Sequence, residues 1–309
     1  MGMIPNNKHK NSFRLSDEAR AEIDREFLFV PERHISKPEV PEEGGDIPNE
    51  SENTEEVQKK RKRHWRRRII TGLIVLCAAI IITDIFLLFL SGRIWFNEPK
   101  KRDYPIRGPV ISEKEGEVQW RGFAAQNIQI CYIRATKGVS YEDKRFEYNK
   151  EGSGASGLPT GMIHVFDPLK DGEKQAEHFI KVCGGMGGRL RPVVDCDFGL
   201  IYSVLPVDEE KVSDRLRAFA DKIKEKYGCT PIIKCDKDSY EKIAGKERFD
   251  DCGIWYVSEF KKIPDGVRAD LWGYSSRVKF KYYESGGFLE MVVLNSGEED
   301  YSKLTIKGE

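Results

Sequence analysis

One uninterrupted apolar run limits the fold of this 309-residue chain more than any other feature. Residues 69–90 read IITGLIVLCAAIIITDIFLLFL and carry a single charge, at Asp84. As a helix this run would be about 33 Å long, enough to cross a hydrocarbon core of about 30 Å. It lies too deep in the chain and is too long for a secretory signal peptide. We therefore expect one transmembrane helix over residues 69–90.

The flanking charges predict the orientation of this helix. Residues 59–68, KKRKRHWRRR, carry eight Lys or Arg and no acid, whereas only Arg93 lies near the other end. The positive-inside rule places residues 1–68 in the cytoplasm and the chain beyond the span outside, in the cell membrane of a single-pass protein. Next to a span, the basic cluster indicates topology and contact with the lipid bilayer rather than with nucleic acid. The 51 basic and 51 acidic residues of the whole chain also cancel, which disfavours a nucleic-acid partner.

Two smaller questions concern the span and the segment before it. Asp84 lies six residues from the outer end, where its carboxylate can reach the interface; a polar contact with a partner helix is the alternative. Residues 16–29 have an amphipathic pattern behind a candidate N-cap, Ser16, which predicts a short helix. Residues 38–58 are rich in Pro, Gly, Glu and Asn and almost lack apolar side chains, so we expect a disordered linker there.

Beyond a stalk at residues 91–103, short apolar runs alternate with amphipathic segments such as 172–182 and 209–227. The expected strands are 128–133, 160–166, 190–197, 230–235, 253–258, 269–274 and 287–294. This alternation predicts an α/β fold with a parallel sheet, and at this length a barrel built from residues 104–309.

The cysteines leave the redox question open. Cys77 lies in the span, and the six beyond it, which can form disulfides outside the cell, are Cys131, Cys183, Cys196, Cys229, Cys235 and Cys252. Cys229 and Cys252 each precede an expected strand, so we expect them to pair if those strands are neighbours. No CxxC or HxxxH spacing accompanies the cysteines, so no metal and no cofactor is expected.

Residues 191–198, RPVVDCDF, carry the clearest chemical signal. Asp195 and Asp197 are two apart in an expected strand and therefore project to the same face, while Cys196 faces away. Two carboxylates at the carboxyl end of a barrel strand are a candidate catalytic pair. The alternative is a solvated strand end in which aspartate caps a helix or a turn.

Several segments in this order resemble the glycoside hydrolase family 25 lysozymes. They are GPVISEKEGEVQW, IQICYIRATKG, GLPTGMIHVF, PVVDCD, YGCTPIIK, IWYVSEF, LWGYSS and VVLN, within residues 104–296. The resemblance implies a flattened β/α barrel, similar to a TIM barrel, whose carboxyl-terminal rim binds and cleaves the glycan strands of peptidoglycan in the cell wall.

The same resemblance implies a catalytic site with an incomplete set of acids. Val110 stands in GPVIS where the family's GxDVS has its acid, and Val293 stands in VVLN where the family has VDLN. Asp195 matches the DxE strand, but Asp197 stands where the general-acid Glu is expected. Lys137 takes a place where the family frequently has an acidic or amide residue.

These departures predict a large loss of activity. Shortening Glu to Asp withdraws the carboxyl by about 1.5 Å, and a misplacement of about 1 Å can cost on the order of a hundredfold in rate. Losing a positioned acid or base costs about 10² to 10⁴. Glu113 and Glu290 lie three residues from Val110 and Val293, so strand alternation places them on the opposite faces, away from the site.

Aromatic residues near the expected strand ends are candidate sugar-binding residues, and His164 is a further candidate. The substrate-binding candidates are Tyr132, His164, Trp255, Trp272 and Tyr274. Their rings could stack on sugar faces; packing in the barrel core, with His164 as a hydrogen-bonded core histidine, is the alternative.

Three hypotheses for the function follow. The first is a membrane-tethered pseudoenzyme that recognises peptidoglycan glycan and hydrolyses it weakly or not at all. The second is an active lysozyme that cleaves the N-acetylmuramic acid to N-acetylglucosamine linkage with Asp195 and Asp197. The third is a non-catalytic scaffold whose acidic amino-terminal tail binds a cytoplasmic protein partner.

Overall fold

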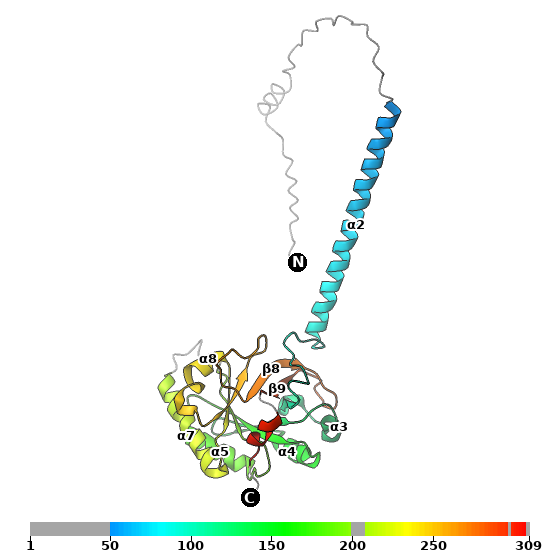
Figure 1. Cartoon of the computed structure of the whole chain (residues 1–309). Helices are drawn as coiled ribbons and strands as arrows, with labels where there is room; N and C mark the ends of the chain where they lie inside the picture. The colour runs from blue at the N-terminus through cyan, green and yellow to red at the C-terminus, as the bar shows by residue number, and fades with distance from the viewer. Residues whose placement is uncertain (1–49, 199–207, 296–297, 307–309) are drawn as a thin grey trace, which may run out of the picture. The chain divides into compact units, whose positions relative to one another are not determined.

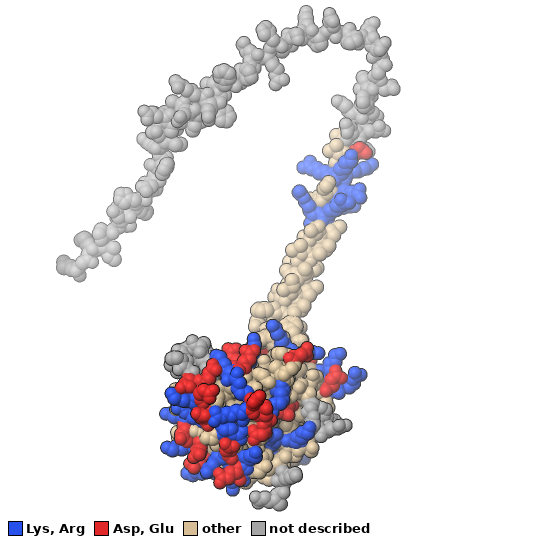
Figure 2. Space-filling model, turned by 60° about the vertical axis from the view of Figure 1, so that its left-hand side comes forward, with Lys and Arg blue, Asp and Glu red and all other residues tan. Residues whose placement is uncertain are grey.

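A long helix leads into a closed barrel in the computed structural model, which describes residues 50–198, 208–295 and 298–306 (Figure 1). The chain divides into two units, Met1–Ile70 and Thr71–Glu309. Helix α2, Glu50–Leu90, contains a stretch that is long and apolar enough to cross a membrane. Figure 2 shows Lys and Arg gathered along α2 just before its apolar stretch.

Helix α2 corrects the expected disordered linker over residues 38–58, because the helix already begins at Glu50. The residues that follow include Glu, Gln, Lys and Arg, which have high helix propensity and extend a helix that continues into the apolar run. The expected helix at 16–29 and the linker residues 38–49 lie outside the described residues.

Eight strands form a barrel that closes where β1 pairs with β2. A ninth, short strand, β3, pairs antiparallel with the end of β2. In sheet order they are β1 Arg107–Ile111, β9 Leu289–Leu294, β8 Leu271–Val278, β7 Gly253–Val257, β6 Ile232–Cys235, β5 Val193–Asp195, β4 Thr160–Val165, β2 Cys131–Lys137 and β3 Tyr141–Glu142. Strand β9 runs antiparallel to β1 and β8, so the barrel is mixed rather than wholly parallel. The predicted α/β barrel is confirmed, with this difference in the direction of one strand.

Helices cover the outside of the barrel. They are α3 Trp120–Ala124, α4 Phe146–Ala155, α5 Gly172–Cys183, α7 Glu209–Tyr227 and α8 Lys237–Ser239, with short 3-10 or π turns η1 Glu113–Glu115, η2 Tyr240–Ala244, η3 Glu247–Phe249 and η4 Glu298–Leu304. Helix α7 begins at the N-cap Asp208, whose side chain accepts from the Lys211 amide, and ends at Gly228 in the left-handed conformation.

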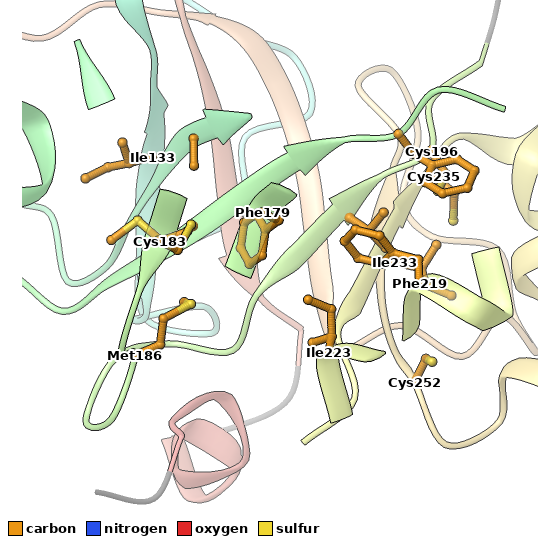
Figure 3. Close-up of a cluster of buried hydrophobic side chains, with 14 of the residues drawn as sticks. Ile133, Phe179, Cys183, Met186, Cys196, Phe219, Ile223, Ile233, Cys235 and Cys252 are labelled. Carbon is orange, nitrogen blue, oxygen red and sulfur yellow. The ribbon is translucent and has the colours of Figure 1, made fainter. Parts of the chain in front are cut away.

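Hydrophobic clusters lie on both faces of the strands. The barrel interior holds Val110, Ile130, Tyr132, Ile163, Leu190, Val193, Ile232, Trp255, Leu271, Val292, Leu294 and Leu304. The outer cluster packs alternate strand residues such as Ile133 and Ile233 against Phe179 of α5 and Phe219 of α7 (Figure 3). Strand alternation thus determines which residues can reach the carboxyl-terminal rim of the barrel from inside.

All seven cysteines are free thiols. The expected disulfide between Cys229 and Cys252 is therefore absent from the structure, although both residues do precede neighbouring strands, β6 and β7. Cys196 and Cys235 lie in the outer cluster, which also contains Phe219 (Figure 3). Burial raises the pKa of the Cys196 thiol well above its usual range, which keeps it protonated and unreactive.

The stalk that follows α2 is bound to the barrel by hydrogen bonds to backbone carbonyls of β8 and of the loop between β7 and β8. Trp95 Nε1 donates to the carbonyl oxygens of Tyr274, at 2.9 Å, and Glu259, at 3.0 Å. The Asn97 amide donates to the Lys261 carbonyl at 2.8 Å. Residues 91–103 therefore have a specific bound conformation against the β7–β8 connection.

Candidate active site

A cleft of about 760 Å³ opens where β2, β4, β5 and β6 end. It is lined by Glu113, Lys114, Arg134, Lys137, Gly138, Val139, Ser140, Tyr141, Asp143, Val165, Asp167, Lys170, Asp195, Asp197 and Lys234. The carboxyl ends of parallel strands meet at this rim, which is where a β/α barrel presents its chemistry. Asp195 and Asp197, predicted from the sequence, both lie here.

A buried ion-pair network forms the floor of this cleft. Asp195 and Lys234 are register partners on the neighbouring strands β5 and β6, so their side chains project together into the barrel. Lys234 Nζ lies 3.1 Å from Asp195 Oδ2 and 2.8 Å from the carboxylate of Glu290 on β9. The Lys234 and Asp195 side chains are 7% and 10% exposed, so the pair is largely shielded from water.

The charge of Lys234 is fixed by its neighbours. Burial alone would lower the pKa of its ammonium, but the carboxylates of Asp195 and Glu290 outweigh this effect and raise the pKa above its ordinary value. Lys234 also lies 5.5 Å from the centre of the Trp255 ring, a further favourable contact for a cation. A protonated lysine thus sits between two acids at the base of the cleft.

Both carboxylate oxygens of Asp195 accept hydrogen bonds from the protein. Oδ2 accepts from Lys234 Nζ, and Oδ1 accepts from the Asp197 backbone N–H at 3.2 Å. A carboxyl group held as a double acceptor is not arranged to give a proton to a glycosidic oxygen. Asp197 is exposed at the rim and is the other member of the predicted pair.

The two valines that replace expected acids lie on different faces of the barrel. Val110 on β1 is register partner to Tyr132 and faces the apolar interior. Val293 on β9 faces outward and packs with Trp272, Tyr274 and Met291. Only Val110 therefore lies on the interior side of the barrel that also carries Asp195.

Glu290 and Glu113 do not face away from the site, contrary to the expectation from their spacing to Val293 and Val110. Glu290 and Val293 do lie on opposite faces, but Glu290 is the one that points inward, to Lys234. Strand β1 ends at Ile111, so alternation does not extend to Glu113, which begins the η1 turn and lines the cleft. Alternation therefore held for Glu290, where the assignment of the inward face was wrong, and it failed for Glu113, which lies beyond the strand.

Other rim acids are engaged by local donors. Asp143 accepts the backbone N–H groups of Glu113, at 2.9 Å, and Arg145, at 3.0 Å; burial nevertheless raises the pKa of its carboxyl. A hydrogen bond from Tyr141 lowers the pKa of Glu113 and raises that of the Tyr141 hydroxyl to about 12. Asp167 Oδ1 accepts from the Leu169 amide at 2.9 Å.

The five proposed sugar-binding residues are all buried and none of them lines the cleft. Tyr132 and Trp255 pack in the barrel interior with ring centres 5.1 Å apart, whereas Trp272 and Tyr274 pack on the outer face. This packing corrects the predicted stacking role, since a buried ring offers no face to a sugar.

His164 is likewise a core residue, held between strand and helix. Its Nδ1 accepts from the Thr136 hydroxyl at 2.7 Å, and its Nε2–H donates to Gln175 Oε1 at 3.2 Å. Its ring stacks on Phe219 with centres 5.0 Å apart. Burial lowers the pKa of this imidazole to about 4, so it is neutral at physiological pH.

Sequence reasoning missed Lys234, Glu290 and Arg134 as members of the site. Lys234 interrupts the buried strand IIKC, and a charge inside such an apolar run was an available signal. Glu290 interrupts the apolar strand LEMVVL in the same way, but its contact with Lys234 depends on how the barrel closes across 56 residues.

Comparison with known proteins agrees with this geometry. Residues 111–286 match the family described as Glycosyl hydrolases family 25. The chain is 26% identical over 187 residues to an autolytic lysozyme of Clostridium acetobutylicum, covering 59% of this chain and 51% of that protein. It is 30% identical over 81 residues to lysozyme M1 of Streptomyces globisporus, covering 26% and 28% of the two chains. The chain thus spans about half or less of the length of these two lysozymes.

Solved structures show the same barrel. A family 25 glycosyl hydrolase from Bacillus anthracis superposes with a TM-score of 0.61 at 26% identity, covering 68% of this chain and 97% of that one. A bacterial lysozyme from Streptomyces coelicolor, 19% identical, shares the fold with a TM-score of 0.58 over 65% of this chain and 96% of that one. With its family match extending over more than half of its length, the chain belongs to glycosyl hydrolases family 25.

Proposed function

We propose that this protein is a membrane-tethered, extracytoplasmic muramidase-like domain that binds peptidoglycan glycan strands and hydrolyses them weakly or not at all. Family membership supports the choice of ligand, since two relatives of the chain are named lysozymes. The observation that carries the proposal is that both carboxylate oxygens of Asp195 already accept hydrogen bonds inside the protein. One oxygen accepts from Lys234 and the other from the Asp197 backbone N–H.

Glycoside hydrolysis needs one carboxylic acid to protonate the leaving oxygen and a second carboxylate to stabilise or capture the sugar cation. Here Val110 offers no carboxylate and Asp195 is bound to a lysine, which leaves Asp197 as the acid at the position of the expected donor. The other rim acids, Glu113, Asp143 and Asp167, accept hydrogen bonds from local backbone donors, so we infer that the second carboxylate role is poorly filled. The open cleft remains available for a polysaccharide.

Membrane tethering rests on α2. Its apolar stretch is long enough to span a bilayer, and the basic residues before it favour the cytoplasmic side. A family 25 domain acting on cell wall would then lie on the outer side, close to its polymer. Adding protease to intact cells tests this orientation: the barrel should be degraded while an epitope tag at the amino terminus survives.

The function itself is tested with the full-length chain in detergent micelles and purified peptidoglycan. The pelleted fraction of protein measures binding, and released reducing ends measure cleavage. We expect binding with no reducing ends above those of a buffer control. Turnover that Asp197→Asn abolishes would establish an active lysozyme instead, and the absence of binding would favour the scaffold, whose partners crosslinking should capture.

A further inference from the structure

Strand β2 carries an irregularity that changes which side chains reach the cleft. Its pairing with β4 shifts register between Arg134 and Thr136, so Ala135 is an extra residue, a β-bulge. Ala135 and Thr136 both face the helices, the first in the outer cluster and the second on His164. Arg134 and Lys137, three residues apart, therefore both line the cleft, where unbroken alternation would separate them. Bulges commonly re-aim side chains at functional sites.

Arg134 has no partner among the residues that the structure describes. Across residues 50–198, 208–295 and 298–306 its guanidinium makes no hydrogen bond or ion pair, and its Nε is buried without an acceptor. Leaving the N–H of a charged group buried and unpaired is unfavourable. The guanidinium lines the cleft, so an oxyanion that enters the cleft can pair with it, and a guanidinium binds carboxylate or phosphate through two parallel hydrogen bonds.

Four acids of the cleft accept hydrogen bonds from donors other than Arg134, although the charge of Arg134 still acts on Glu113 and Asp143. Asp195 is held by Lys234, Asp143 by two backbone amides, and Asp167 by the Leu169 amide. Glu113 accepts from the Lys144 amide at 3.1 Å as well as from Tyr141. Although the lining carries equal numbers of acids and bases, these acids are already engaged by internal donors.

Lys137 adds a second positive charge at the same end of β2, and its side chain is exposed to the cleft. We infer that Arg134 and Lys137 form an anion-binding subsite that takes a carboxylate or a phosphate carried by the cell-wall polymer. The inference rests on the proposed function, since it names the chemistry by which the cleft would hold its ligand.

The test measures binding of the full-length chain in detergent to four samples of one cell-wall preparation. The first is native, the second has its phosphodiester polymers removed with hydrofluoric acid, the third has its carboxyls converted to methylamides, and the fourth has received both treatments. We expect Arg134→Gln to weaken binding to native wall at least tenfold and Lys137→Gln to weaken it several-fold. The treatment that removes the group bound by Arg134 should weaken wild-type binding by about the same factor as Arg134→Gln does. On that treated wall, the wild type and Arg134→Gln should bind with equal affinity.

Controls separate charge at this subsite from general charge and from folding. Lys226→Gln removes an exposed lysine from the last turn of α7, away from the cleft lining, and should bind as the wild type does. Arg134→Lys keeps the charge but loses the planar fork, so it should bind between wild type and Arg134→Gln. Thermal unfolding of each variant checks that the barrel is intact, and wild-type binding should weaken as salt rises from 50 to 300 mM.

Two results would overturn this inference while leaving the proposed function standing. The first is that folded Arg134→Gln and Lys137→Gln bind native wall as tightly as the wild type does. The second is that the wild type binds the doubly treated wall as tightly as the native wall. Should Arg134→Gln fail to fold, Lys137→Gln and the salt titration decide by the same criteria. If the unmodified protein fails to bind native wall, the proposed function falls together with the inference.

Discussion

At the scale of the residue, the site differs from a hydrolytic one through Lys234. A lysine between Asp195 and Glu290 turns two acids into the acceptors of an internal ion-pair network. Asp195 could be predicted from its spacing to Asp197 in the expected strand 190–197, because that spacing is local, although β5 itself ends at Asp195. Lys234 and Glu290 could be recognised as its partners only once the register of β5 with β6 and the closure of the barrel were known.

Replacing Lys234 by methionine should destabilise the barrel strongly. The change leaves Asp195 and Glu290 as two largely buried carboxylates without their cation, and breaking a buried pair in this way costs about 3–5 kcal/mol. Urea unfolding of the full-length chain at pH 7 measures the loss. Asp195→Asn with Lys234→Met should cost less than the sum of the two single changes, since each removes the same interaction. A loss below about 1 kcal/mol for Lys234→Met would contradict the assigned network.

His164 predicts a defined pH dependence of stability. Burial lowers the pKa of its imidazole to about 4 in the folded protein from 6.5, so the unfolded chain binds more protons between these values. Stability from this group is full above pH 6.5 and is lost as the pH falls toward 4. The loss between pH 7 and pH 5 is about 2 kcal/mol.

The comparison of two variants isolates this group from other titrating residues. His164→Asn should show a flatter fall of unfolding free energy between pH 7 and pH 5 than the wild type. Leu169→Ala, which changes an exposed side chain that carries no titratable group, should retain the wild-type slope. Equal slopes for His164→Asn and wild type would show that His164 does not titrate as its surroundings indicate.

At the scale of the element, most strands could be predicted from apolar runs, but their directions and faces could not. Strand β1 was missing from the strands expected from apolar runs, because Gly108 and Pro109 are poor strand formers, and only the family resemblance indicated a strand there. Gly108 is needed there because a Cβ would lie 1.6 Å from the Ile130 carbonyl oxygen, a contact made when β1 and β2 close the barrel. The antiparallel direction of β9 is set by its pairing with both β1 and β8.

The stalk is an element whose docking can be tested directly. Trp95→Phe removes the donor to the Tyr274 and Glu259 carbonyls while keeping an aromatic ring, and should weaken docking by about 1 kcal/mol. Hydrogen exchange of backbone amides in residues 91–103 should accelerate. Phe96→Leu, which changes a ring that is 76% exposed, should leave the exchange unaltered. Unchanged exchange in Trp95→Phe would mean that these hydrogen bonds do not hold the stalk.

At the scale of the whole molecule, the sequence alone indicated an apolar span followed by a barrel of the lysozyme family, because both signals extend over long stretches of chain. The state of the cleft depends on contacts that join β5, β6 and β9, which no local pattern encodes. The central claim is therefore that the cleft lies where the fold places an active site, but its acids are bound to groups within the protein.

The most direct test of this claim is the number of reducing ends that the full-length protein releases from peptidoglycan between pH 4 and pH 8. The Clostridium acetobutylicum autolytic lysozyme on the same substrate provides a positive control. We predict that the wild type releases no more than the Asp195→Asn/Asp197→Asn double variant at any pH in this range. Release well above that of the double variant would contradict the account and establish an active hydrolase.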